Sequence, residues 1–184
     1  MTNLPRRVET RRLRLDATCA AHADAIHRAV RATLSELQPW MPWARDPSPD
    51  EQLAFATHAE RQWDACLSWN FTIFLESEVI GSIGLDNYQP LIKTCDLGYW
   101  IQTDCAGRGY MTEAGAAVIE FAFDRLEMHR IQLLAAVGNR ASQRVAEKLG
   151  FKSEGIQRDG SKGAFEWHDT YMLGLVSSDP RPKS

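Results

Sequence analysis

The stretch from Asp104 to Ala114, "DCAGRGYMTEA", joins an aromatic run, "LGYWI", to a run with helical spacing, "GAAVIEFAFDRL". Two glycines, Gly107 and Gly109, lie one residue apart between this predicted strand and this predicted helix. Because glycine has no Cβ, backbone N–H groups there can approach an anion closely, and the positive end of the helix favours negative charge. The stretch therefore predicts a cradle for a phosphate or pyrophosphate group.

Two well-known nucleotide-binding loops do not fit this stretch. A dinucleotide-binding fingerprint needs a third glycine where Thr112 stands, and a Walker loop needs a G-K-[ST] triplet, which is absent. Taken alone, the two glycines are better explained as a tight turn from strand to helix. The phosphate hypothesis therefore needs support from a second segment.

That second segment is "VGNRASQRVAEKLGF", residues 137–151. It places Asn139 at the start of a predicted helix, Ser142 three residues later and Gly150 at its end. Each residue also suits a stable helix, as N-cap, third residue and C-terminal glycine. Helix stability explains the residue types, but it does not explain their combination with the glycine loop.

The rest of the chain predicts alternating strands and helices. Apolar alternation predicts seven strands and periods of three and four predict helices, with a proline-rich loop at 38–50. The strands are expected at 11–16, 69–76, 79–88, 94–101, 130–137, 151–158 and 166–176, and the helices at 20–37, 51–67, 111–122 and 140–149. The hairpin and the all-strand ending favour a mixed sheet of about seven strands with helices on both faces, in an α/β (α+β) fold. We expect one domain over residues 1–184, with a structured core at about 8–176.

Composition excludes several function classes. The net charge of −3 and the pI of about 6.0 argue against a nucleic-acid surface. The local exception is "PRRVETRRLRL", which is better explained as an exposed strand face than as a docking surface for an acidic partner. The four cysteines show no metal-binding or disulfide spacing, and no apolar run is long enough for a membrane span. We expect a cytoplasmic protein without a metal site.

The glycine loop and the Asn139 helix together resemble the acyl-CoA-binding signature of the GNAT superfamily of N-acetyltransferases. The family loop, Q/R-x-x-G-x-G/A, matches at Gly107 and Gly109 but departs at Asp104. The RimJ/RimL-type branch, the ribosomal-protein N-terminal acetyltransferases, is closer still. Its blocks are resembled, in order, by "LQPWMPWA", "GSIGLDNYQPLIKTCDLGYWI", "GRGYMTEA", "HRI", "GNRASQRVAEKLGF", "EG" and "HDTYML".

The resemblance implies a GNAT fold in which acetyl-CoA lies in a cleft where the sheet splays between strands 94–101 and 130–137. Main-chain groups of Tyr99, Trp100 and Ile101 would pair with the pantetheine arm. Asn139 would bond the pantetheine, and Ser142 would stand near the thioester sulfur. Loop N–H groups would hold the pyrophosphate, at Gly107, Arg108, Gly109, Tyr110 and Met111.

The resemblance also implies direct attack by an amine on the thioester, with Ser142 as the partner of the departing thiolate. RimL-type enzymes carry an acid at the position of Ser161, so the base is open here. Asp159 and Glu113 are the catalytic candidates, Glu166 and Asp86 are further carboxylates, and each is more readily a solvated or capping side chain. His129, His168 and Cys105 are better explained by structural or incidental roles.

The acceptor follows from amine chemistry. At pH ~7.5 an α-amine is about one-third neutral, whereas a lysine amine is neutral about once in a thousand. With no secure base, an α-amine of a peptide or protein is favoured. A small-molecule amine and a catalytically silent acyl-CoA-binding module stay open as alternatives. Trp40, Trp43 and Asp86 are candidates for the acceptor groove, and analogy with related enzymes suggests a homodimer.

Overall fold

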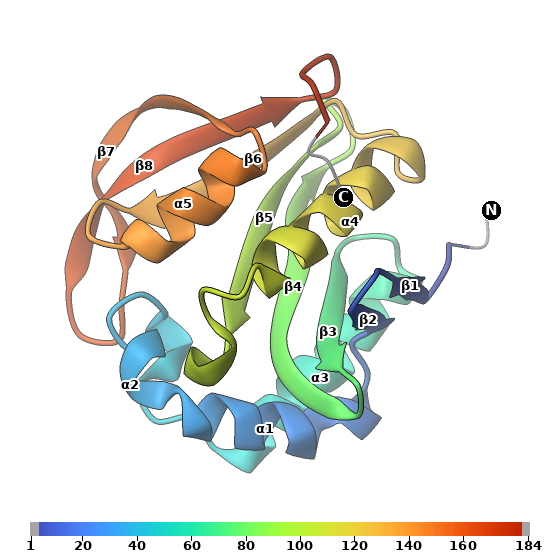
Figure 1. The fold of residues 1–184 in the computed structure, drawn as a ribbon, viewed down its shortest axis with the longest axis vertical. Helices are drawn as coiled ribbons and strands as arrows, with labels where there is room; N and C mark the ends of the chain where they lie inside the picture. The colour runs from blue at the N-terminus through green and yellow to red at the C-terminus, as the bar shows by residue number, and fades with distance from the viewer. Residues whose placement is uncertain (1–3, 182–184) are drawn as a thin grey trace.

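The computed structural model describes residues 4–181 as one eight-stranded mixed sheet flanked by helices (Figure 1). The strand order is β1-β2-β3-β4-β5-β6-β8-β7, and among these neighbours only β5 and β6 run parallel. The strands are β1 (Arg7–Glu9), β2 (Leu13–Ala17), β3 (Trp69–Leu75), β4 (Glu78–Gln89), β5 (Thr94–Ile101), β6 (Arg130–Ala136), β7 (Lys152–Lys162) and β8 (Trp167–Val176).

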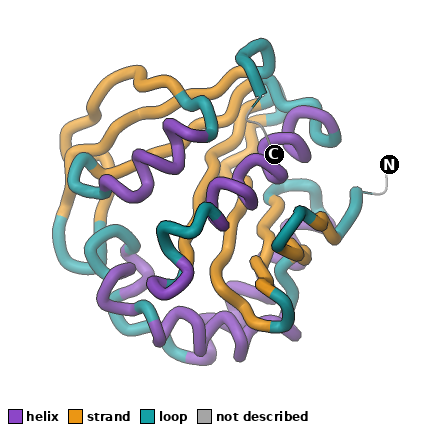
Figure 2. The backbone as a smooth tube through the Cα atoms, viewed as in Figure 1, coloured by secondary structure: helices purple, strands orange, loops and turns teal. Residues whose placement is uncertain are grey.

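Helices cover both faces of the sheet. The helices are η1 (Ala20–His22), α1 (Ala23–Ala32), α2 (Leu34–Leu37), η2 (Pro42–Ala44), α3 (Pro49–Asp64), η3 (Thr103–Cys105), α4 (Tyr110–Asp124) and α5 (Arg140–Lys148). Figure 2 shows α4 and α5 lying in front of the strands. The apolar residues of α4 join the larger core cluster, and those of α1 join a second cluster with Trp100. Because Tyr99 packs against the first cluster and Trp100 belongs to the second, the two clusters lie on opposite faces of β5.

The sheet separates between β5 and β6. Their parallel pairing covers only Thr94 to Asp96 on β5, opposite Arg130 to Gln132 on β6. Beyond that point β6 stays paired with β8 up to Ala136, and β5 stays paired with β4 up to Ile101. The region from Leu97 to Ile101 therefore has no partner strand on its β6 side within residues 4–181.

The predicted order of strands and helices is confirmed, with three local differences. The sheet has an eighth strand, β1, which is only three residues long. The single helix expected at 20–37 is broken at Thr33, which lies between α1 and α2. The Thr33 side chain accepts a hydrogen bond from the Thr103 backbone N–H. Helix α3 starts at Pro49 rather than at residue 51, because proline suits the first helical position. A capping box between Ser48 and Glu51 satisfies backbone N–H groups at its N-terminus.

Close backbone contact explains Gly81 in β4. A Cβ on Gly81 would collide with the carbonyl oxygen of Trp100 on β5. The glycine therefore lets β4 and β5 pair closely where β5 leaves β6.

Within residues 4–181, every helix is too short or too polar to cross a membrane.

Candidate functional site

The glycine loop lies between η3 and α4 and is exposed at residues 106–109. Gly107 and Gly109 have φ values of 74° and 81°, a region that other residues rarely adopt. A Cβ on Gly107 would meet no atom within 4 Å, so the space beside that glycine is open. The loop thus presents main chain to a ligand without side chains in the way.

The N-terminus of α4 opens directly onto this loop. Gly109 is its N-cap and supplies no side-chain cap for the first N–H groups of the helix. A helix of 15 residues concentrates partial positive charge at this end. Loop and helix together fit an anionic diphosphate.

The unpaired edge of β5 leads away from the loop toward α5. Tyr99, Trp100 and Ile101 lie on this edge, beyond the last residue paired with β6. Their main-chain groups on that side can pair with an extended ligand as a strand would. The edge therefore fits the amide-containing arm of a thioester carrier.

On the other side of the splay, α5 carries Asn139 and Ser142. Asn139 caps the helix, because its Oδ1 accepts a hydrogen bond from the Ser142 backbone N–H at 3.1 Å. The side-chain nitrogen of Asn139 makes no hydrogen bond within residues 4–181, so it is available to a ligand carbonyl. The capping and ligand-binding roles of Asn139 are therefore compatible.

A hydroxyl pair bridges the splay from β5 to α5. The Tyr99 hydroxyl lies 3.1 Å from both Ser142 Oγ and the Ser142 carbonyl oxygen, and when its one proton is directed to Oγ the Ser142 proton is free for a ligand. Burial raises the pKa of Tyr99 to about 12, although its contact with Ser142 lowers it. Tyr99 is therefore a neutral donor at physiological pH and can fix the orientation of the Ser142 hydroxyl.

Glu113 lies in the first turn of α4, but its carboxylate is engaged. It accepts hydrogen bonds from Thr10 Oγ1, from Arg12 N and from Arg12 Nε, at 2.6, 2.8 and 2.6 Å. Burial alone would raise the pKa of Glu113, but these hydrogen bonds outweigh it and leave the pKa below its ordinary value. Such a carboxylate is a weak proton acceptor near neutral pH.

The carboxylates of the C-terminal hairpin lie apart from the hydroxyl pair. Asp159 is exposed in the irregular part of β7, and its backbone N–H donates to Asp169 Oδ1. At the RimL-type acid position, Ser161 Oγ lies 2.6 Å from Thr170 Oγ1. Glu166 is exposed at the β7–β8 turn. Neither carboxylate, Asp159 or Glu166, makes a hydrogen bond to Ser142 within residues 4–181.

The two tryptophans of the segment 40–43 pack toward the sheet and the hairpin. Trp43 makes an edge contact with Trp100, with ring centroids 6.4 Å apart, and stays 42% exposed. Trp40 lies beside His168, at 5.4 Å between centroids. A Cβ on Gly138 would lie 3.2 Å from Trp40, so this ring also borders the start of α5.

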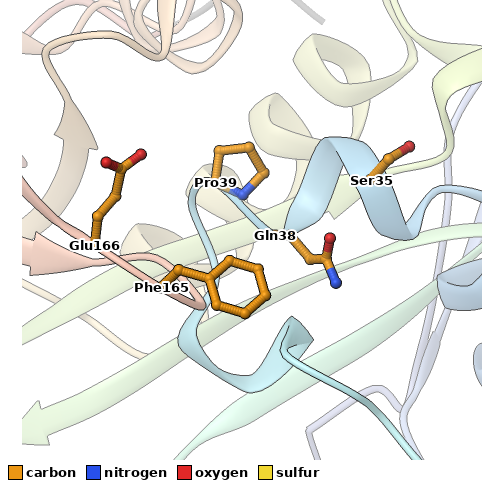
Figure 3. Close-up of a pocket in the computed structure, with 5 residues that line it drawn as sticks. All are labelled: Ser35, Gln38, Pro39, Phe165 and Glu166. Carbon is orange, nitrogen blue, oxygen red and sulfur yellow. The ribbon is translucent and has the colours of Figure 1, made fainter.

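His168 ties the segment after α2 to the C-terminal hairpin. Its Nε2 donates to the Pro39 carbonyl at 2.7 Å, and the Ala164 backbone N–H donates to the Gln38 carbonyl at 2.8 Å. Beside these contacts lies a small pocket, separate from the glycine loop (Figure 3). It is lined by Ser35, Gln38, Pro39, Phe165 and Glu166.

The remaining candidates occupy separate places. Asp86 accepts a hydrogen bond from Asn70 and lies four residues along β4 from the partner of Trp100, or about 13 Å. The structure thus does not bring Asp86 beside the two tryptophans. Burial raises the pKa of Cys105, so this thiol in the loop region is not activated. His129 is exposed just before β6.

Two site contacts were missed from the sequence. The Tyr99 hydroxyl was not singled out, because only the main chain of the strand was expected to matter. The contact of Arg12 with the glycine loop was missed because the two segments are about a hundred residues apart and no local pattern joins them.

The sequence of this chain is similar to a known family and to named bacterial proteins. Residues 12–152 match the acetyltransferase (GNAT) domain family. The protein YdaF of Bacillus subtilis (strain 168), whose name describes a ribosomal N-acetyltransferase, is 29% identical over 159 residues, covering 85% of this chain and 87% of YdaF. The ribosomal-protein-serine acetyltransferase of Escherichia coli (strain K12) is 28% identical over 148 residues, covering 78% and 80%.

A solved structure shares the fold. The ribosomal-protein acetyltransferase RimL, in complex with coenzyme A, superposes with a TM-score of 0.87 at 23% sequence identity, covering 96% of this chain and 99% of RimL. The family match covers the glycine loop, the open edge of β5 and the start of α5. Enzymes of this family use acetyl-CoA, and the chain belongs to the GNAT acetyltransferase family.

Proposed function

We propose that this protein transfers an acetyl group from acetyl-CoA to a primary α-amine at the N-terminus of a peptide or protein. The observation that carries the proposal is the continuous path from the glycine loop, along the open edge of β5, to the hydroxyl pair of Tyr99 and Ser142. The loop fits a diphosphate, the edge fits an amide-containing arm, and the pair provides donors for a sulfur at the end of that arm.

The residues of the chain have distinct parts in this reaction. The amides from Gly107 to Met111 hold the diphosphate, and Asn139 with the β5 edge holds the pantetheine arm. The incoming amine forms a bond to the acetyl carbon while the carbon–sulfur bond breaks. Ser142, oriented by Tyr99, donates a hydrogen bond to the thiolate and passes its proton to the sulfur, and the Ser142 hydroxyl regains a proton from solvent water. A water molecule takes the proton that the amine loses.

The acceptor is inferred from the lack of a well-placed general base among the candidate carboxylates. The carboxylates considered for this role are either engaged, as Glu113 is, or placed on the exposed hairpin, as Asp159 is. An α-amine needs the least help because a large share of it is neutral near pH 7.5. The relatives named as ribosomal-protein acetyltransferases support a protein N-terminus as the acceptor. Trp40 and Trp43 are the proposed rim of its groove.

The setting of the enzyme is part of the proposal. We infer a single domain with a core at about residues 8–176, acting in the cytoplasm, where the four unpaired thiols would stay reduced. A homodimer is the expected assembly. Light scattering coupled to size-exclusion chromatography tests it.

The deciding experiment measures free CoA release with acetyl-CoA and a panel of amines. Peptides with free α-amines, the same peptides blocked at the N-terminus, and small amines would be compared. Turnover with the free peptides alone is expected. Turnover with small amines alone would show that the acceptor is a small molecule and not a peptide N-terminus. Tight CoA binding without any turnover would indicate a catalytically silent binding module.

A further inference from the structure

The turn between β1 and β2 lies against the glycine loop, although the two are about a hundred residues apart in sequence. Glu113, in the first turn of α4, accepts hydrogen bonds from Thr10 and from two donors of Arg12. The side chain of Glu113 is only 15% exposed. A short N-terminal turn is therefore fastened to the helix that begins at the proposed diphosphate site.

Arg12 extends past Glu113 into the loop itself. Its Nη1 donates to the Arg108 carbonyl at 3.1 Å, and its guanidinium lies 4.4 Å from the centroid of the Tyr110 ring. Its Nη2 lies 3.4 Å from a Cβ placed on Gly109. One side chain thus contacts Arg108 and Tyr110 and lies beside Gly109 between them.

These contacts answer a physical need of the loop. Two glycines with positive φ have many accessible conformations, so an unsupported loop would lose much entropy on closing around a ligand. A planar guanidinium can bond a carboxylate and a carbonyl while it lies on an aromatic ring, which a lysine ammonium cannot do at once. A loop fixed in advance binds its ligand more tightly.

We propose that Arg12, held by Glu113 and Thr10, is a positioning residue that fixes residues 108–110 in the conformation that binds the CoA diphosphate. This inference rests on the proposed use of CoA by the same loop. Arg12 acts through the loop backbone, so its loss weakens the cofactor site and leaves the acceptor site unchanged.

The neighbouring arginines support an internal role for this basic segment. Arg6 pairs with Asp64, and both Arg7 and Arg14 pair with Asp16. Most of the charge in the segment is therefore neutralised by the chain itself. This argues against an acidic docking partner as the reason for the arginines.

Arg14 provides a closely matched control. Its side chain and that of Arg12 are both 35% exposed, and each pairs with one carboxylate. Each guanidinium also lies over an aromatic ring, Phe74 at 4.3 Å for Arg14 and Tyr110 at 4.4 Å for Arg12. Arg14 makes no contact with the glycine loop within residues 4–181. The two arginines thus differ mainly in that Arg12 contacts the glycine loop and Arg14 does not.

The experiment compares Arg12→Met, Arg12→Lys and Arg14→Met with the wild type. Calorimetric titration gives the Kd for CoA, steady-state kinetics gives KM for acetyl-CoA and for the acceptor, and thermal melting gives Tm. For Arg12→Met we expect the CoA Kd and the acetyl-CoA KM to rise about tenfold, with the acceptor KM within twofold of wild type. Arg12→Lys should behave like Arg12→Met, and Arg14→Met should bind CoA as the wild type does.

Contrary results are distinct. If the wild type binds CoA and Arg12→Met binds it equally well, or Arg12→Lys restores full affinity, the positioning role is wrong while the proposed function stands. Equal weakening by Arg14→Met would show a general loss of stability, which also overturns the positioning role. A wild type that binds no CoA would overturn both proposals.

A second variant keeps the test valid if Arg12→Met does not fold. Thr10→Val retains the shape of the side chain and removes the hydroxyl that donates to Glu113. We expect it to raise the CoA Kd about twofold to threefold. The double variant Thr10→Val/Glu113→Gln should raise Kd no more than Glu113→Gln alone, because both act on one contact. If the effects of the two substitutions on the CoA Kd multiplied fully, Thr10 and Glu113 would not act together on Arg12.

Discussion

The cofactor side and the acceptor side of this molecule are built in different ways. The cofactor side consists of backbone: a loop with two left-handed glycines, a strand edge without a partner and the start of a helix. The proposed acceptor side consists of side chains on two segments, 38–44 and 163–168, joined by His168 and by the Ala164 backbone.

This difference explains which properties can be inferred. Backbone geometry binds any ligand with a diphosphate and an extended amide arm, so its signature recurs wherever that ligand is used. Loop side chains define one particular acceptor, and they vary freely on the same fold. The predictions below test this contrast between the two sides, beginning with the largest expected effect.

Gly109→Val should abolish CoA binding. Valine at φ 81° is strained, and its Cβ would lie 3.4 Å from Arg12 Nη2 beside the loop. Titration calorimetry should show at least a hundredfold loss of affinity. Gly98→Ala, on β5 with nothing within 4 Å of the added Cβ, is the control and should bind CoA normally. Wild-type affinity in Gly109→Val would show that the loop does not hold the ligand.

Ser142→Ala should lower kcat by about a hundredfold, since it removes the proton donor for the thiolate. The Kd for CoA should change less than threefold, because the Asn139 cap and the loop stay in place. Stopped-flow or steady-state release of CoA measures the rate. An unchanged kcat would remove Ser142 from the reaction.

Tyr99→Phe should lower kcat by about fivefold to tenfold with little change in CoA affinity. The ring keeps its packing, and only the hydroxyl contacts with the Ser142 carbonyl and Oγ are lost. In the Ser142→Ala background the same change should have no further effect on kcat. A full additional loss there would mean that Tyr99 acts independently of Ser142.

His168→Phe should raise the acceptor KM about fivefold while leaving the acetyl-CoA KM unchanged. Phenylalanine keeps the contact with Trp40 but loses the hydrogen bond to Pro39, which is worth about 1 kcal/mol. Steady-state kinetics with each substrate varied in turn separates the two constants. An equal rise in both would break the distinction between the two sides.

Glu113→Gln should destabilise the protein near pH 7, and this effect should shrink as the pH falls into the acid range. The pKa of Glu113 is lowered on folding, so its carboxylate adds stability above the unfolded value of about 4.3 and loses it as pH falls through the folded value. Melting curves of both proteins from pH 3 to pH 8 measure the difference in Tm. A difference that does not change with pH would show that ionisation of Glu113 is irrelevant.

Much of the fold followed from local patterns. The expected strand 94–101 is β5, and the expected helix 140–149 is α5 with one residue fewer, because apolar spacing and caps are local properties. The break at Thr33 was not predictable in this way. It depends on a bond to Thr103, seventy residues away, which outweighs the helix propensity of the surrounding run.

In the candidate site, too, features set by adjacent residues were predictable, and features set by contacts between distant segments were not. The glycines and the start of α5 were visible because their chemistry lies in adjacent residues. The engagement of Glu113 was not visible, because it arises where a distant turn meets α4. A carboxylate that looks like a base in sequence can thus be a structural anchor once the chain is folded.

A crystal structure of the protein with CoA tests the central claim most directly. We predict the diphosphate within hydrogen-bond distance of the amides from Gly107 to Met111, the arm along β5, and the sulfur beside the Ser142 hydroxyl. A diphosphate bound elsewhere, with these amides facing only solvent, would contradict the account.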